Sequence, residues 1–164
     1  MSSKDPPSIE DMILKSYNKR EKEIKLYDFI NSSGVNEIKQ WLNLLKKKNK
    51  KAFAKINAKI NILKNVKDPN LMPNLLENVP NSTHLLELKT TGRSSYRIIL
   101  CRELVRTQGS QDSKDDNDLE YTFLMGCQEK DNKYQPKDTV RSSERKRKEV
   151  LNDPTNRRMP HEEV

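Results

Sequence analysis

Two neighbouring segments of the chain repeat apolar residues at intervals of three and four, and this repeat constrains the fold more than any other feature. The first segment carries Val35, Ile38, Trp41, Leu42 and Leu45. The second segment carries Phe53, Ile56, Ile60, Leu63 and Val66. Such spacing places apolar side chains on one face of a helix. The sequence therefore predicts an α-helical hairpin over residues 35–66, with Trp41 in the core rather than serving as a base-stacking platform.

Alternating side chains on both sides of this hairpin predict strands. Residues 23–30 alternate before it, and residues 84–90 and 96–102 alternate around a turn, as in an antiparallel β-hairpin. Residues 121–126 resume the pattern. The chain is therefore expected to add one strand before the helices and three after them.

The remaining segments complete the expected order of elements. Residues 67–82 contain three prolines and predict a loop, and residues 137–151 predict a polar, basic helix that ends at Asp153 and Pro154. The order β, α, α, β, β, β, α indicates an α+β fold. We expect an N-terminal strand, the helical hairpin, a mostly antiparallel sheet with helices on one face, and a C-terminal helix.

Composition limits the size and the class of the protein. Only 32 % of the 164 residues are apolar, which favours one small domain over two. We expect this domain over 23–151, with a flexible acidic insertion at 107–119, a partly disordered extension at 1–22 and a tail at 152–164. No apolar stretch reaches the roughly 18 residues of a membrane span, and no leader opens the chain, so we expect a cytoplasmic protein with no membrane partner.

Cysteine and histidine are too few for a metal or disulfide framework. The chain has 2 Cys and 2 His, without the spacing that zinc sites use. We therefore expect no metal site and no cofactor. A reducing compartment suits such cysteine usage.

The net charge of +8 is distributed unevenly. Ten lysines and no acid lie between residues 39 and 67, whereas residues 107–120 carry five acids against one base, and residues 137–150 carry six bases against three acids. The densest run consists of Lys46, Lys47, Lys48, Lys50 and Lys51. A solvated helix face explains such a run equally well, but two basic blocks in one small domain favour an anionic partner such as RNA.

A second polar set is expected on the sheet face opposite Leu86 and Leu88. Alternation places Lys89 on that face, with Arg97 just across the turn and Arg93 within the turn. The residues that follow the last strand add Gln128, Lys130, Lys133 and Tyr134. Cations with an amide and a phenol suit the binding of a phosphodiester and the stabilisation of charge on phosphorus. Ordinary surface ion pairs are the alternative interpretation.

These segments together resemble the RelE superfamily of bacterial toxins, nearest to its HigB-like, phage-derived branch. The resemblance spans residues 23–151 and rests on the order strand, helical hairpin, three strands. It also rests on "LLELK" at 85–89 with "GRSSYRIIL" at 92–100, which are similar to the family's "L-x-E-L-R … R-Y-R-I-L-Y". Finally, "FLMGCQEKDNKYQPKD" at 123–138 resembles "L-L-H-G-F-x-K-K-T-x-K-T-P" followed by a basic helix.

The resemblance implies a toxin of a type II toxin–antitoxin system, an endoribonuclease that cuts mRNA on the ribosome through attack of the RNA 2′-hydroxyl on the adjacent phosphorus. It gives Lys89 the role of general base or phosphate contact, and Arg97 the role of phosphate stabilisation. Lys130 and Lys133 match family lysines, and Tyr134 matches a tyrosine that stacks on a base or transfers a proton. A cognate acidic antitoxin is the implied protein partner.

Two positions depart from the family pattern. Met125 stands where the branch often has histidine, and Gln128 stands where RelE has arginine. The lost charge at Gln128 leaves open a non-catalytic inhibitor of DNA gyrase, like the ParE branch. The departures together with the acidic insertion leave open a degenerate RNA-binding module without toxicity. A further hypothesis is that the acidic insertion screens the cationic face.

Overall fold

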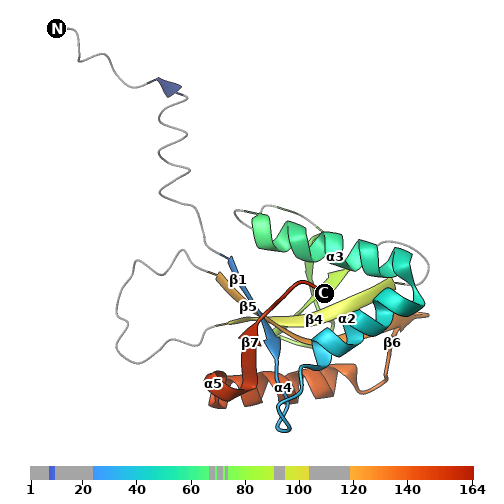
Figure 1. Ribbon diagram of the computed structural model, residues 1–164, viewed down its shortest axis with the longest axis vertical. Helices are drawn as coiled ribbons and strands as arrows, with labels where there is room; N and C mark the ends of the chain where they lie inside the picture. The colour runs from blue at the N-terminus through green and yellow to red at the C-terminus, as the bar shows by residue number, and fades with distance from the viewer. Residues whose placement is uncertain are drawn as a thin grey trace, which may run out of the picture.

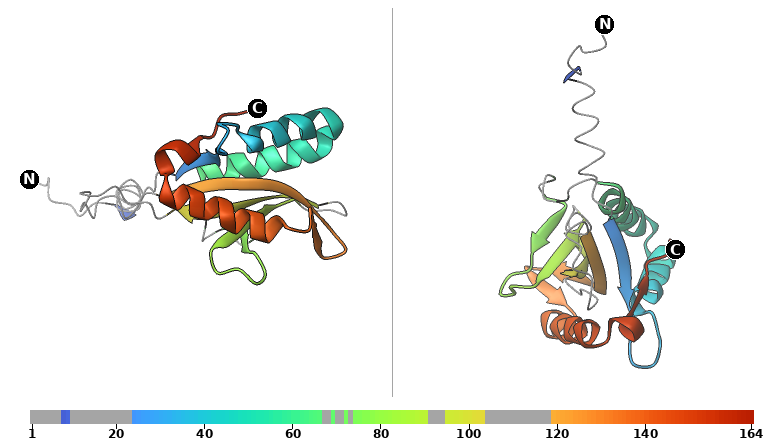
Figure 2. Two further views of the ribbon diagram at one scale, coloured as in Figure 1. Left: turned by 90° about the horizontal axis from the view of Figure 1, so that it is seen from below. Right: turned by 90° about the vertical axis from the view of Figure 1, so that its left-hand side faces the viewer.

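A single sheet with helices on both sides makes up the described part of the chain (Figures 1 and 2). The computed structural model describes residues 8–9, 24–66, 69, 72, 74–90, 95–103 and 119–164. The strands are β1 (Ile24–Phe29), β2 (Leu76–Asn78), β3 (Leu85–Lys89), β4 (Ser95–Glu103), β5 (Leu119–Lys130), β6 (Lys133–Gln135) and β7 (Arg158–Pro160). The helices are α2 (Glu37–Lys48), α3 (Lys50–Asn65), α4 (Thr139–Asn152) and α5 (Pro154–Arg157). Arg93, most of the N-terminal extension and residues 107–118 of the insertion lie outside the described residues.

Helices α2 and α3 form the predicted hairpin, with only Asn49 between them. The Asn49 side chain accepts a hydrogen bond from the N–H of Ala52 at 3.1 Å and so caps α3. Its own N–H donates to the carbonyl of Leu45 and closes α2. Asparagine is among the best residues for capping a helix N-terminus, because its short side chain reaches the free N–H groups of the first turn. The lysine run therefore lies across the junction of the two helices.

The order of strands in the sheet confirms the predicted fold class. Within the described residues the sheet is seven-stranded, in the order β2-β3-β4-β5-β1-β7, with β6 also paired to β5. Strand β1 runs parallel to β5, and the other pairs are antiparallel. The α+β fold with a mostly antiparallel sheet is thus confirmed. Strand β5 is longer than predicted because it pairs with β4, β1 and β6.

Both faces of the sheet are covered, which differs from the predicted arrangement. Leu88 and Ile98 pack against α2 and α3, whereas Leu85 and Ile99 lie in a second cluster with Val150 of α4. Figure 2 shows the sheet between the helical hairpin and α4. The prediction of helices on one face is wrong, because successive strand residues point to opposite faces and here both faces carry apolar side chains.

Three short strands were not predicted. Strand β2 lies in the predicted loop at 67–82 and pairs with β3, and β6 folds back on β5. Strand β7 lies in the predicted tail and pairs with β1. Each of these strands has three residues, too few for an alternating pattern to be recognised, and each pairing depends on the neighbouring strand rather than on local sequence.

Polar contacts hold the C-terminal residues onto the sheet. The Arg158 guanidinium lies 3.9 Å from the ring centroid of Tyr27 and 3.0 Å from the carboxylate of Glu120. The Nδ1 atom of His161 lies 2.8 Å from the Oδ1 atom of Asp28, and both side chains are buried. The segment predicted as a tail therefore completes one edge of the sheet.

Candidate functional site

Lys89 and Arg97 lie side by side on one sheet face, as the alternation predicts. They are Cα partners in the β3–β4 pair, and Cys127 of β5 is the partner of Arg97 on its other side. Tyr134 reaches the same face from β6, where it is the Cα partner of Glu129. Three of the five predicted catalytic residues are thus brought together.

The guanidinium of Arg97 is held between two carboxylates. Its Nη1 atom lies 2.5 Å from Oε1 of Glu87, and its Nη2 atom lies 2.5 Å from Oε2 of Glu129. Oε2 of Glu87 accepts a hydrogen bond of 2.5 Å from the hydroxyl of Tyr134. The side chains of Arg97 and Glu87 are only 11 % and 4 % exposed. The two η nitrogens that would face a phosphate are therefore already engaged.

Lys89 is also paired. Its Nζ atom lies 2.7 Å from Oε2 of Glu77, on the neighbouring strand β2. Together, Glu77, Glu87 and Glu129 give three carboxylates to two cations on this face. The cations are therefore ion-paired, as in the alternative interpretation, but the pair of Arg97 and Glu87 is buried rather than at the surface.

Burial and the carboxylates also determine the protonation states in the cluster. Burial acts to lower the pKa of Arg97, but the hydrogen bond and charge of Glu87 outweigh it, so the pKa is raised and the guanidinium stays charged. Burial, reinforced by the hydrogen bond to Glu87, raises the pKa of Tyr134 well above its ordinary value. Burial, reinforced by the charge of Glu87, raises the pKa of Cys127 to about 12. Neither the phenol nor the thiol is poised as a base at neutral pH.

Lys130, Lys133 and Gln128 are chain neighbours of residues in this cluster but alternate away from its face of the sheet. Lys130 and Lys133 are Cα partners where β5 turns into β6, and both are exposed. Gln128 pairs with Tyr96, and alternation from the buried Cys127 places it on the opposite face of the sheet. The structure therefore does not bring Gln128 to the Arg97 cluster, which consists of Arg97, Lys89, Tyr134, Glu77, Glu87 and Glu129.

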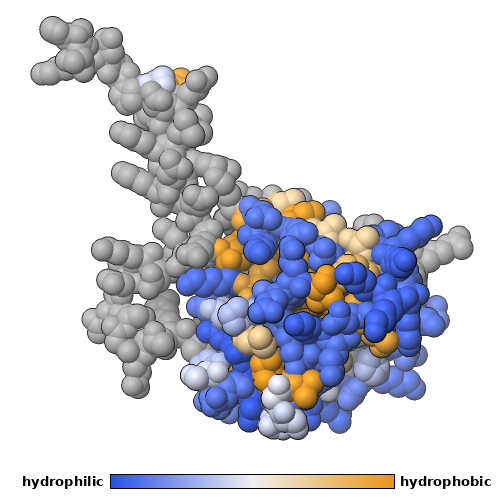
Figure 3. Space-filling model, in the orientation of Figure 1, coloured by the Kyte–Doolittle hydropathy of each residue, from blue (hydrophilic) through white to orange (hydrophobic). Residues whose placement is uncertain are grey.

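The lysine cluster, defined as Lys46, Lys47, Lys48, Lys50 and Lys51, occupies the end of the hairpin. Figure 3 shows that this end of the molecule is mainly hydrophilic. The ammonium of Lys46 lies 3.4 Å from the carbonyl oxygen of Val164 and 5.5 Å from the ring centroid of Phe53. Among the residues that the structure describes, no carboxylate lies within ion-pair distance of the other four lysines. Within the described residues, the lysine cluster is thus less compensated by carboxylates than Lys89 and Arg97 are.

Three glutamates were missed as site residues, although the sequence contained part of the signal. Alternation places Glu87 on the same strand face as Lys89, and Glu129 on the same face as Cys127. Nothing local indicated that Glu77 would join them, because β2 was predicted as a loop. The face predicted to be cationic therefore also carries its own counter-charges.

The described residues contain no group of three or more His, Cys, Asp or Glu side chains that could hold a metal ion. None of the described helices combines the length and apolar character needed to cross a membrane. Comparison of the chain with known protein families, with curated proteins and with solved structures finds no match.

Proposed function

We propose that the protein binds RNA through the lysine cluster at the junction of α2 and α3. The single observation that carries the proposal is the contrast between the two sets of cations. Lys89 and Arg97 are neutralised by carboxylates, whereas the lysine cluster presents ammonium groups to solvent. Clustered, uncompensated cations gain the most from releasing the counterions that surround a phosphate backbone.

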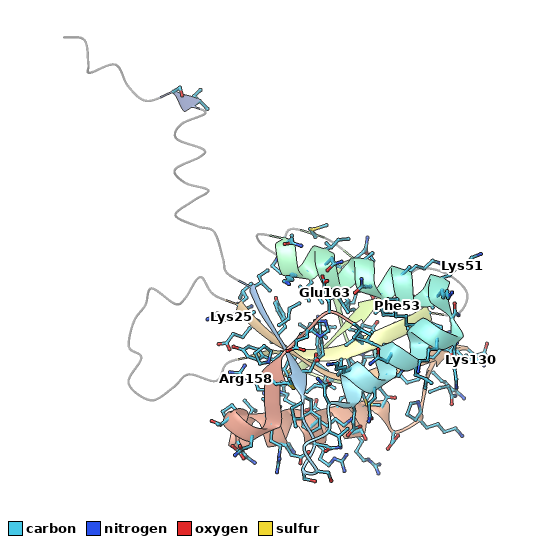
Figure 4. All side chains as sticks on the ribbon, in the orientation of Figure 1. Lys25, Lys51, Phe53, Lys130, Arg158 and Glu163 are labelled. Atoms are coloured by element: carbon cyan, nitrogen blue, oxygen red, sulfur yellow. The ribbon has the colours of Figure 1, made fainter. Side chains whose placement is uncertain are left out.

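The exposed lysines of the β5–β6 turn support the same proposal. Figures 1 and 2 show this turn at the same end of the molecule as the junction of α2 and α3. In Figure 4, Lys130 and Lys51 lie at this end, whereas Lys25 lies at the opposite one. A strand of RNA that crosses this end can contact both groups of cations.

Cleavage of mRNA on the ribosome is the second candidate function. The observation that favours it is the placement of Lys89, Arg97 and Tyr134 on one sheet face, as the resemblance to RelE toxins requires. The ion pairs weigh against it, because a scissile phosphate would have to displace Glu129 before it could contact Arg97. The geometry therefore favours binding without cleavage. An acidic antitoxin is a compatible competitor for the lysine cluster, since it offers the same charge complementarity.

A salt titration of RNA binding tests the proposal. Single lysines are replaced at the two ends of the molecule, Lys51→Gln in the cluster and Lys25→Gln as the matched control. The logarithm of the affinity for a single-stranded RNA should fall with the logarithm of salt concentration, with a slope reduced by about 0.7 per lost phosphate contact. Lys51→Gln should show this reduction and Lys25→Gln should not. Equal effects of the two variants would show that binding is diffuse rather than directed.

Expression in a bacterium separates the candidates. Growth arrest with new, translation-dependent mRNA ends would establish the endonuclease. RNA binding without new ends would establish the binding module. Inhibition of supercoiling by purified gyrase, with no binding to RNA, would overturn both in favour of the gyrase inhibitor.

A further inference from the structure

A recess of about 280 Å³ lies between α2 and β5, with one side chain contributed by α4. Its wall combines apolar side chains with one amide and one pair of opposite charges. The apolar ones are Trp41, Leu44 and Met125, and the polar ones are Gln40, Glu37 and Lys146. The volume is below the range of about 300–1,000 Å³ that is usual for drug-sized ligands. The recess therefore suits a small ligand rather than a helix or a folded partner.

The indole of Trp41 is held rigidly at one side of this recess. The ring lies directly over Gly126, where a Cβ atom would overlap it, so only glycine allows this approach. Trp41 also contacts Tyr96, with ring centroids 6.3 Å apart and an interplanar angle of 58°. Trp41 packs against the core as predicted, but it is only partly buried and it lines the recess. A fixed, partly exposed indole is a suitable platform for stacking.

The charged groups of the recess are paired with each other, but its polar side chains can still form further hydrogen bonds. The ammonium of Lys146 lies 3.4 Å from one oxygen of Glu37, and the other oxygen of Glu37 accepts a hydrogen bond from Asn31 at 3.0 Å. Lys146 is 5 % exposed and has three donors, so it retains donors beyond the one directed at Glu37. Gln40 is exposed and offers both a donor and an acceptor. The recess thus presents hydrogen-bonding groups without a net negative charge.

The recess is continuous with the lysine cluster along α2. Residues three and four apart share a helix face, so Leu44 is followed on its own face by Lys47 and Lys48. The part of a ligand that contacts Leu44 would therefore lie one helical turn from two ammonium groups. An occupant with a flat, hydrogen-bonding ring joined to an anionic chain matches both features.

We propose that the recess between α2 and β5 holds one nucleobase of a bound RNA, stacked on Trp41 and hydrogen-bonded by Gln40 and Lys146. The inference rests on the proposed RNA binding and names the part of the ligand that enters the fold. Unpaired bases of single-stranded RNA commonly stack on aromatic side chains while cations follow the backbone. An acidic peptide has the charge but not the flat ring.

Intrinsic fluorescence provides a direct test, because Trp41 is the single tryptophan of the chain. The full chain is titrated with each of the four nucleoside monophosphates, and with ribose 5-phosphate as a control that has the phosphate but lacks the base. The nucleotides should change the emission of Trp41 to a saturating limit, and ribose 5-phosphate should leave it unchanged. An equal response to ribose 5-phosphate or to polyglutamate, or no response to any nucleotide, would overturn the proposal.

Two exposed aliphatic residues, one inside the recess and one outside it, give a matched pair of variants for measuring RNA affinity. Leu44, 49 % exposed, lines the recess, whereas Ile62, 39 % exposed, lies on α3 outside it. Leu44→Gln should weaken binding of single-stranded RNA by about fivefold or more, in the range of one lost base contact, and Ile62→Gln should not. If RNA binds without changing the emission of Trp41, and the two variants bind RNA with the same affinity, the recess proposal fails while RNA binding stands. If no RNA binds, the proposed function fails, and the titration with nucleotides still decides on the recess.

Discussion

Replacing Arg97 should cost far more stability than replacing its cross-strand neighbour Lys89. Arg97→Met leaves the carboxylate of Glu87, which is 4 % exposed, without its cation in the interior. Removing one partner of a buried ion pair costs about 3–5 kcal/mol, because the remaining charge cannot be hydrated. Lys89→Met breaks a pair whose side chains are 30 % and 35 % exposed, and such a pair contributes about 0–1 kcal/mol.

The measurement is unfolding by urea, followed by circular dichroism, on the two variants and the wild type. A double variant extends the test: with Glu87→Met added to Arg97→Met, the more deeply buried of the two uncompensated carboxylates disappears, while Glu129, 21 % exposed, is still partly hydrated. At least half of the lost stability should therefore return. Equal losses in the two single variants, or a double variant less stable than Arg97→Met, would refute the reasoning. The stability of Arg97→Met also matters for tests of function, because a variant that is partly unfolded loses activity whether or not Arg97 contacts RNA.

Three further predictions concern Cys127, Gly126 and His161. The raised pKa of Cys127, about 12, makes stability fall as the pH rises from the unfolded value near 9 through 12, and Cys127→Ala should show a smaller fall in urea titrations at alkaline pH. Gly126→Ala should lower stability by about 1–3 kcal/mol, measured by thermal unfolding, because the new methyl group overlaps the Trp41 ring. His161→Ala should cost about 1.5–3 kcal/mol in the same measurement, since the buried Asp28 loses a hydrogen-bond partner.

Each of these predictions has a result that contradicts it. If the free energy of unfolding of Cys127→Ala and of the wild type falls equally at alkaline pH, the thiol does not contribute to the pH dependence of stability. A Gly126→Ala variant as stable as the wild type would mean that the indole moves freely. Wild-type stability in His161→Ala would mean that β7 docks on β1 without that contact.

The elements that the sequence predicted well are those whose signal is local. Helices α2 and α3 follow from apolar residues three and four apart, and β3 and β4 follow from alternation, because both patterns repeat within one element. Alternation also placed Lys89 and Arg97 on one sheet face. Strands β2, β6 and β7 were missed because three residues carry too little pattern.

The candidate site could be predicted only in part, because its charge state depends on distant residues. Glu77 reaches Lys89 from β2, and Glu129 reaches Arg97 from β5, so neither ion pair is visible within one segment. The recess likewise joins α2, β5 and α4, and the ring of Trp41 lies over Gly126, which is far from it in the sequence.

The fold class, the helical hairpin and the concentration of lysine at its end can all be inferred from the amino-acid sequence. These depend on short-range periodicity and on covalent order, which are present before the chain folds. Only the folded structure shows which cations have carboxylate partners among the described residues. Coulomb attraction and burial act between side chains that only folding brings within a few ångströms, and here they neutralise the sheet cations while leaving the lysine cluster exposed.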